Sequence, residues 1–180
     1  MPEVSIRNAD TARDAAVCAA IYAPHVESSP VSFEEQAPGV AELAARIERY
    51  GASHAWLVAE RDGEVVGYAY ATPFNERPAY RWSTNVSVYI AESARGQGIG
   101  RALYTALFER LRERGFHMAC AGVTLPNEAS VGLHESLGFE PVGVNREIGW
   151  KQGAWRDVGW WQLELAPPGD EPPAEPRPSW

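Results

Sequence analysis

The segment that most constrains the fold runs from Asn85 to Leu111, NVSVYIAESARGQGIGRALYTALFERL. Its first six residues alternate apolar and polar side chains, which predicts a strand. Three glycines follow, at positions 96, 98 and 100. The next apolar residues recur at helical spacing, which predicts a helix closed by Gly115; they are Ile99, Leu103, Ala106, Leu107 and Leu111. A strand, a glycine-rich loop and a helix therefore follow one another.

Three glycines ahead of a helix allow several interpretations. A dinucleotide fingerprint requires its third glycine at position 101, where this chain has Arg. A P-loop requires Lys after the last glycine, and Arg101 stands there instead. A tight turn would need only one glycine. An anion cradle fits best, because unshielded backbone N–H groups at a helix N-terminus attract negative charge, and Arg95 and Arg101 would add to it.

The rest of the chain predicts one domain over residues 1–165, with an α/β (α+β) mixed sheet. Two apolar runs flank Asp62-Gly63 and predict a β-hairpin over 55–71. The other expected strands span 4–9, 117–125, 139–149 and 155–165, and the other helices 10–23, 39–51 and 128–138. Residues 166–180 contain six prolines and are predicted to be disordered.

Composition narrows the function classes. The formal net charge of −8 argues against nucleic-acid binding. The chain has no apolar run of transmembrane length and does not begin like a signal peptide, so we expect a soluble, cytoplasmic protein without a membrane partner. Cys18 and Cys120 have no metal-binding or redox spacing, and the sequence predicts no metal site.

At this point the residues resemble a known family. SVYIAESARGQGIGRALYTAL is similar to the acetyl-CoA-binding motif of the GCN5-related N-acetyltransferases (GNAT), through Arg95, Gly98 and Gly100. The later LPNEASVGLHESLGF is similar to the second cofactor segment of that family. The resemblance implies the GNAT fold, a mixed central sheet of about six to seven strands flanked by helices. Within the family, GWKQGAWRDVGWWQLEL resembles the phosphinothricin N-acetyltransferase subgroup.

The resemblance implies a binding mode for acetyl-CoA. The pantetheine arm would lie along the strand at Val88, Tyr89 and Ile90, as an added strand does. The pyrophosphate would lie on the glycine loop, whose expected contacts are Arg95, Gly96, Gln97, Gly98, Ile99, Gly100 and Arg101. Asn127 and Ser130 match cofactor-contacting positions of the family, although Asn127 can equally cap the following helix.

The resemblance also implies catalytic roles. The oxyanion would meet the backbone N–H of Val88 or Tyr89. His134 occupies the position from which family members stabilise the leaving thiolate, unless it is only a packed helix residue. The subgroup carries its general base, a glutamate, where this chain has Asn85, which cannot accept a proton at neutral pH. Water could instead relay the proton, or a carboxylate could accept it, with Glu76, Glu34 and Glu35 as candidates.

The expected substrate is a small amino-acid-like amine of the phosphinothricin or methionine sulfoximine type, attacked directly in a ternary complex. Its contacts would come from two segments: Asn75, Glu76 and Arg77, then Asn85, Val86 and Ser87. Arg77 could hold a carboxylate or be an ordinary surface residue. The tryptophans after position 149 suit a homodimer interface. The alternatives are an acetyltransferase for another amine, such as a peptide N-terminus or a polyamine, and a weakly catalytic acyl-CoA-binding protein.

Overall fold

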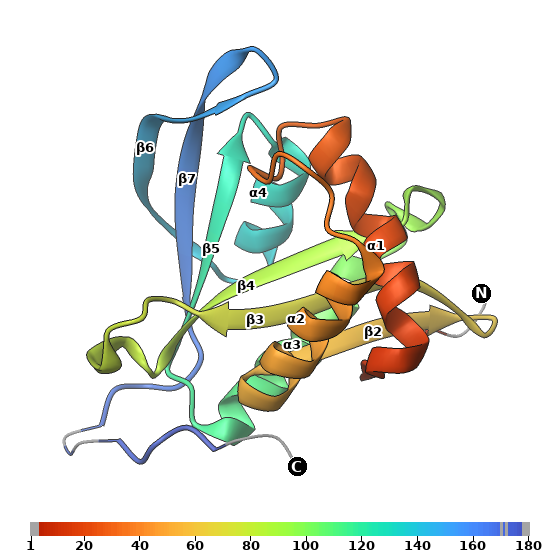
Figure 1. Cartoon of the computed structure of the whole chain (residues 1–180). Helices are drawn as coiled ribbons and strands as arrows, with labels where there is room; N and C mark the ends of the chain where they lie inside the picture. The colour runs from red at the N-terminus through yellow and green to blue at the C-terminus, as the bar shows by residue number, and fades with distance from the viewer. Residues whose placement is uncertain (1–3, 170, 172, 178–180) are drawn as a thin grey trace.

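The computed structural model describes residues 4–169, 171 and 173–177, and seven strands form one sheet within them (Figure 1). Their order across the sheet is β1-β2-β3-β4-β5-β7-β6. The strands span Val4–Asn8 (β1), Ala55–Arg61 (β2), Glu64–Pro73 (β3), Ser83–Ile90 (β4), Met118–Leu125 (β5), Glu140–Lys151 (β6) and Ala154–Glu164 (β7). Among the strands of the described residues, only β4 and β5 pair in parallel. The mixed sheet predicted from the sequence is thereby confirmed.

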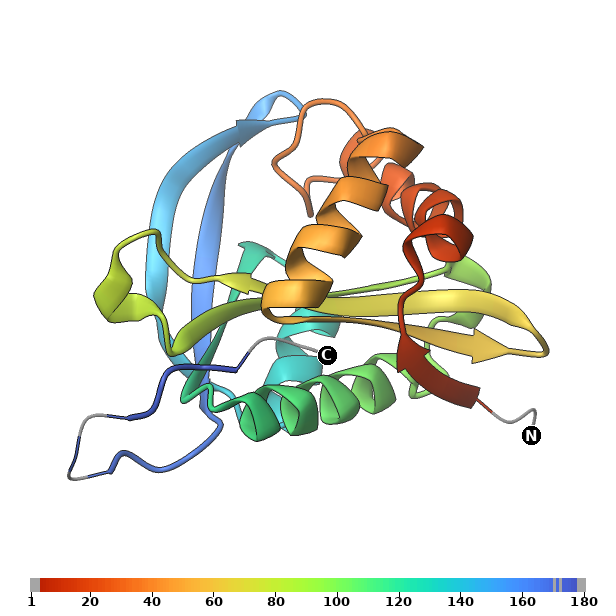
Figure 2. The ribbon, with the colours of Figure 1, turned by 60° about the horizontal axis from the view of Figure 1, so that its bottom comes forward.

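Helices cover both faces of the sheet (Figure 2). α1 (Thr11–Glu27) and α2 (Val40–Ser53) lie on one face, and α3 (Ile99–Arg114) on the other. α4 (Glu128–Ser136) follows β5, and its Val131 and Leu133 pack against the same core as α3. Two short 3₁₀ helices, Pro78–Tyr80 and Glu92–Ala94, lie in segments where we expected only loops.

The two faces of β4 carry different side chains, as the sequence alternation predicts. Val86 is buried in the α3 core, with Val88 and Ile90 packed against it. Tyr89 packs instead against the α1–α2 cluster, which includes Tyr22 and Tyr68. Because side chains alternate along a strand, Asn85 and Ser87 share the α1–α2 face with Tyr89. Two of the candidate substrate residues of β4, Asn85 and Ser87, thus lie on the opposite face from α3, whereas the third, Val86, lies on the α3 face.

Local signals placed most element boundaries to within about two residues. The β2–β3 hairpin turns at Asp62 and Gly63, which have φ values of 53° and 84°, as an Asp-Gly turn requires. The first helix, however, does not end at Pro24 as predicted but continues to Glu27. Its last turn is retained because Val26 is buried, with 1% of its surface exposed. The second helix likewise passes Gly51 and ends at Ser53.

The described part of the C-terminal segment contacts the domain. The indole N–H of Trp82 donates to the carbonyl oxygen of Ala174 at 2.8 Å. Arg177 donates its backbone N–H to the Arg114 carbonyl at 2.8 Å and accepts from the Arg114 side chain at 2.7 Å. Residues 170, 172 and 178–180 lie outside the described residues. Disorder of residues 166–180 in solution stays a prediction. The contacts of Ala174 and Arg177 with the domain would oppose such disorder.

Candidate active site

The central feature of the site is a gap in the sheet between β4 and β5. These strands pair only at Ser83–Asn85 with Met118–Cys120, and beyond that point they diverge. Trp82 directs its carbonyl toward the β5 side, whereas the carbonyl of Ser83 and the N–H of Ala91 face β3. Because backbone groups alternate along a strand, the N–H groups of Val86, Val88 and Ile90 face the gap.

This alternation separates two predicted oxyanion donors. The N–H of Val88 points into the gap, whereas that of Tyr89 points toward β3. The Tyr89 ring is packed in the α1–α2 cluster, 4.7 Å from the ring of Tyr22. Burial raises its pKa well above the ordinary value, so the phenol is no ready acid. Of the two, Val88 is the candidate donor.

A narrow cavity of about 70 Å³ follows the gap. It brings together seven residues predicted from the sequence: Val86, Ser87, Val88, Tyr89, Asn127, Ser130 and His134. Five further lining residues were not predicted: Val31, Tyr104, Gly122, Val123 and Thr124. Helical spacing marked the neighbours of Tyr104 as core, and only the packing of α3 against α4 shows that this tyrosine reaches the cavity.

The glycine loop has the geometry of an anion cradle. Gly96 and Gly98 have φ values of 72° and 78°, and a Cβ on either would have open space within 4 Å. Gly98 is the N-cap of α3 and provides no side-chain cap. The first N–H groups of the helix therefore remain available as hydrogen-bond donors. These features fit the diphosphate of acetyl-CoA.

The remaining residues of the loop have more local roles. A Cβ on Gly100 would lie 3.2 Å from Leu133, so this glycine allows α4 to approach α3. The Ile99 side chain is buried in the core. The Arg101 guanidinium is bound to Ser136, with its Nη2 2.7 Å from the hydroxyl. Gln97 donates to the Ser93 carbonyl at 3.1 Å, and Arg95 is exposed.

His134 is a buried residue of α4, with 4% of its surface exposed. Its Nδ1 lies 2.7 Å from the carbonyl oxygen of Ser130, and its Nε2 lies 3.1 Å from the hydroxyl of Tyr104. Burial lowers the pKa of the ring, which is therefore neutral near pH 7. Asn127 caps the same helix by accepting from the Ser130 N–H at 3.1 Å, and it also lines the cavity.

Asn85 has an unusual hydrogen-bonding state. Its Nδ2 lies 3.3 Å from the carbonyl oxygen of Pro73 and 3.5 Å from that of Phe74. Its Oδ1 is buried, and no described residue donates a hydrogen bond to it. A buried acceptor without a donor is costly, and an incoming N–H group would relieve that cost.

The carboxylates considered as bases are differently placed. Arg46 holds Glu34 at both oxygens, at 2.7 and 3.0 Å, and Tyr22 donates to it at 2.9 Å. Mainly through Arg46, these contacts lower the pKa of Glu34 and make it a weak base. Glu35 and Glu76 are exposed, as are the neighbouring Asn75 and Arg77. None of these four residues lines the β4–β5 cavity.

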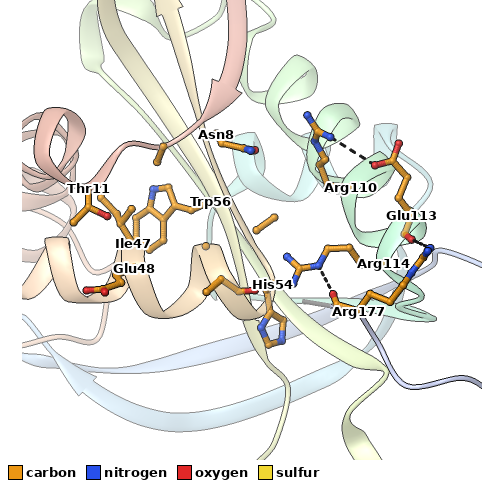
Figure 3. Close-up of a pocket in the computed structure, with 14 residues that line it drawn as sticks. Asn8, Thr11, Ile47, Glu48, His54, Trp56, Arg110, Glu113, Arg114 and Arg177 are labelled. Carbon is orange, nitrogen blue, oxygen red and sulfur yellow. Dashed lines mark hydrogen bonds and ion pairs between the residues drawn. The ribbon is translucent and has the colours of Figure 1, made fainter. Parts of the chain in front are cut away.

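A second and larger cavity, of about 570 Å³, lies at the β1–β2 edge of the sheet and contains none of the predicted site residues (Figure 3). His54, Trp56, Arg110 and Arg114 are among the side chains that line it. Burial lowers the pKa of His54 to about 4, and the Arg114 charge adds to this effect. The smaller cavity is the candidate site, because the gap-facing strand β4 and seven residues predicted from the sequence line it.

No group of three or more His, Cys, Asp or Glu side chains among the described residues could hold a metal ion. No helix in the described ranges is long and apolar enough to cross a membrane.

Comparisons with known proteins agree with this geometry. Residues 19–139 match the family model described as Acetyltransferase (GNAT) family. The chain is 41% identical to a phosphinothricin N-acetyltransferase of Streptomyces viridochromogenes, over 97% of this chain and 92% of that protein. It is 36% identical to an L-methionine sulfoximine/L-methionine sulfone acetyltransferase of Pseudomonas aeruginosa, over 93% of this chain and 98% of that protein.

A solved structure gives the same result for the fold. The structure of a GNAT superfamily phosphinothricin acetyltransferase from Sinorhizobium meliloti in complex with acetyl-CoA superposes with a TM-score of 0.90 at 35% identity. The match covers 96% of this chain and 94% of that one. The β4–β5 gap and the glycine loop at the start of α3 agree with these matches. The chain therefore belongs to the GNAT family of acetyltransferases.

Proposed function

We propose that the protein transfers the acetyl group of acetyl-CoA to the primary amine of a small amino-acid-like acceptor, of the phosphinothricin or methionine sulfoximine type. The amine attacks the thioester directly in a ternary complex. The observation that carries the proposal is the β4–β5 gap, where backbone donors of β4 are left unpaired by β5 and a glycine-rich helix N-terminus follows along the chain. The names of the relatives support the acceptor class.

Acetyl-CoA is the donor substrate, and this chain has groups to hold each part of it. Gly96 and Gly98 leave N–H groups open for the diphosphate. The gap-facing backbone of Val88 and Ile90 can pair with the amide groups of the pantetheine arm, and the Val88 N–H can also stabilise an oxyanion. Asn127 and Ser130 reach the same cavity from the start of α4.

The acceptor would lie on the α1–α2 face of β4, over Asn85 and Ser87. The Oδ1 of Asn85 has no donor among the described residues, and a turn of this side chain would let it accept a hydrogen bond from the acceptor's amine. Asn75, Glu76 and Arg77 lie in the loop between β3 and β4 and would contact the outer part of the acceptor. Attack requires an uncharged amine with a free lone pair. Water would take the proton that the ammonium form must lose.

An amine panel tests the acceptor class. Thiol release from acetyl-CoA would be measured with phosphinothricin, methionine sulfoximine, ordinary amino acids, a peptide with a free N-terminus and a polyamine. We expect kcat/KM to be highest for phosphinothricin or methionine sulfoximine. Preference for the peptide or the polyamine would reassign the acceptor class, and tight acetyl-CoA binding without turnover of any amine would contradict the proposal as a whole.

We also propose that the protein acts as a homodimer in the cytoplasm. The β6–β7 hairpin exposes a group of large apolar side chains: Val142, Val144, Ile148, Trp150 and Trp155. Ile148 is 57% exposed and Trp150 61% exposed, and the rings of Trp150 and Trp155 lie 5.4 Å apart. Such a surface favours association with a second copy.

Sedimentation tests the dimer. The wild-type chain should sediment at twice the mass of one chain, and Ile148→Glu should sediment at the mass of one because it places a charge in the apolar surface. Val40→Glu is the matched control, since Val40 is also apolar and 52% exposed but lies on α2. A wild-type monomer, or a dimer that tolerates Ile148→Glu, would contradict this surface as the interface.

A further inference from the structure

We propose that Tyr104, rather than His134, is the catalytic residue that donates a hydrogen bond to the leaving sulfur, and that His134 is its positioning residue. Both side chains line the β4–β5 cavity. The assignment rests on the acetyl transfer proposed above and names the group that stabilises its leaving thiolate.

The protons of His134 can be placed from its neighbours. The Ser130 carbonyl oxygen can only accept a hydrogen bond, so Nδ1 of His134, 2.7 Å away, carries a hydrogen and donates it. Burial keeps the ring neutral, and a neutral imidazole has one N–H. The Nε2 atom therefore has a lone pair. The Tyr104 hydroxyl, 3.1 Å away, donates to it.

His134 accordingly has no proton to offer to sulfur. Its single N–H is already bound to Ser130, inside the first turns of α4. Tyr104 also lines the cavity, and its hydroxyl carries a proton. Because a phenolic O–H rotates about its C–O bond, it can turn from Nε2 to a developing thiolate.

The ring of Tyr104 is held firmly in place. It is 1% exposed and stacks on Phe108, with ring centroids 5.2 Å apart. The ring centroids of Phe139 and His134 lie 6.5 Å and 5.3 Å from that of Tyr104. With the ring fixed in this way, rotation of the O–H is the one movement that the donor needs when charge develops on the leaving group.

Acetyl transfer from the thioester to the amine needs no further reactant. The free amine forms the C–N bond, and the C–S bond breaks as the sulfur takes its electron pair. The O–H of Tyr104 donates a hydrogen bond to the resulting thiolate, and the proton lost by the amine passes to solvent. A hydrogen bond to a charged acceptor is stronger than one between neutral groups, so the contact favours the products of C–S cleavage.

Two measurements on Tyr104→Phe test the assignment. We expect kcat to fall by about 10- to 100-fold, the strength of one hydrogen bond to a charged group, with the KM for acetyl-CoA unchanged. The pKa of the thiol of bound CoA, followed by the ultraviolet absorbance of its thiolate, should rise by about one unit, a tenfold change in its ionisation. The second measurement needs no acceptor and no turnover, so it separates this assignment from the choice of acceptor.

The controls distinguish a role in the reaction from a role in packing. Tyr68→Phe removes a hydroxyl from another buried tyrosine, in the α1–α2 cluster, and should change neither quantity. His134→Phe should lower kcat, but it should have no further effect when combined with Tyr104→Phe. Normal kcat and an unchanged thiol pKa in Tyr104→Phe would overturn the assignment. So would additive losses in the double variant, which would show that His134 acts on the sulfur independently.

Discussion

Gly98→Glu should weaken acetyl-CoA binding by about 100-fold, because it places a carboxylate in the proposed diphosphate site at the start of α3. Gly98 has a φ of 78° and open space where its Cβ would be, so the new side chain meets no neighbour. It would instead compete with the diphosphate for the free N–H groups of the helix. Titration calorimetry with acetyl-CoA measures the change directly.

The variant also strains the backbone, and this effect needs its own control. A non-glycine residue at positive φ costs on the order of 1–2 kcal/mol of folding free energy. Gly63→Glu imposes the same cost, since Gly63 has a φ of 84° and equally open surroundings, but it lies in the β2–β3 turn. Thermal unfolding should therefore shift similarly in both variants, while only Gly98→Glu loses affinity. If Gly98→Glu and Gly63→Glu bound acetyl-CoA with equal affinity, the diphosphate would not bind at the start of α3.

The sequence predicted the backbone parts of the site better than the side-chain parts. Alternation in 85–90 identified β4, and the glycines with the helical stripe after them identified the loop and α3. These signals are local, because each reports the conformation of consecutive residues. The gap between β4 and β5 depends instead on pairing over only three residues of each strand, and no local pattern encodes where two strands diverge.

Side-chain contacts were harder to predict for the same reason. Tyr104 has the helical spacing of a core residue, and it is indeed buried, so its contact with His134 follows only from how α3 and α4 pack. Glu34 was a possible base by its position in the early loop. Its contact with Arg46, from the following helix, makes it an anion that is hard to protonate. Tyr89 was correctly placed on the strand, but its N–H points away from the gap.

Asn85→Glu should raise activity at acidic pH relative to alkaline pH. In the wild-type chain, Asn85 cannot take a proton, so kcat/KM should rise with pH as the acceptor's amine loses its proton. A glutamate here would offer a carboxylate where the buried Oδ1 now lacks a donor. General-base catalysis contributes about 100-fold or more, and we expect about a tenfold gain in kcat/KM at pH 6 from an unoptimised base.

Asn85→Gln is the matched control, because glutamine has the length of glutamate but accepts no proton. It should keep the wild-type pH profile while showing any cost of the longer side chain. The comparison of kcat/KM between pH 6 and pH 9 in the two variants isolates the carboxylate. If both variants have the same profile, Asn85 does not face the amine. If the wild-type profile is flat over this range, the protein already has a base, and an exposed carboxylate such as Glu76 would have to move toward the acceptor to supply it.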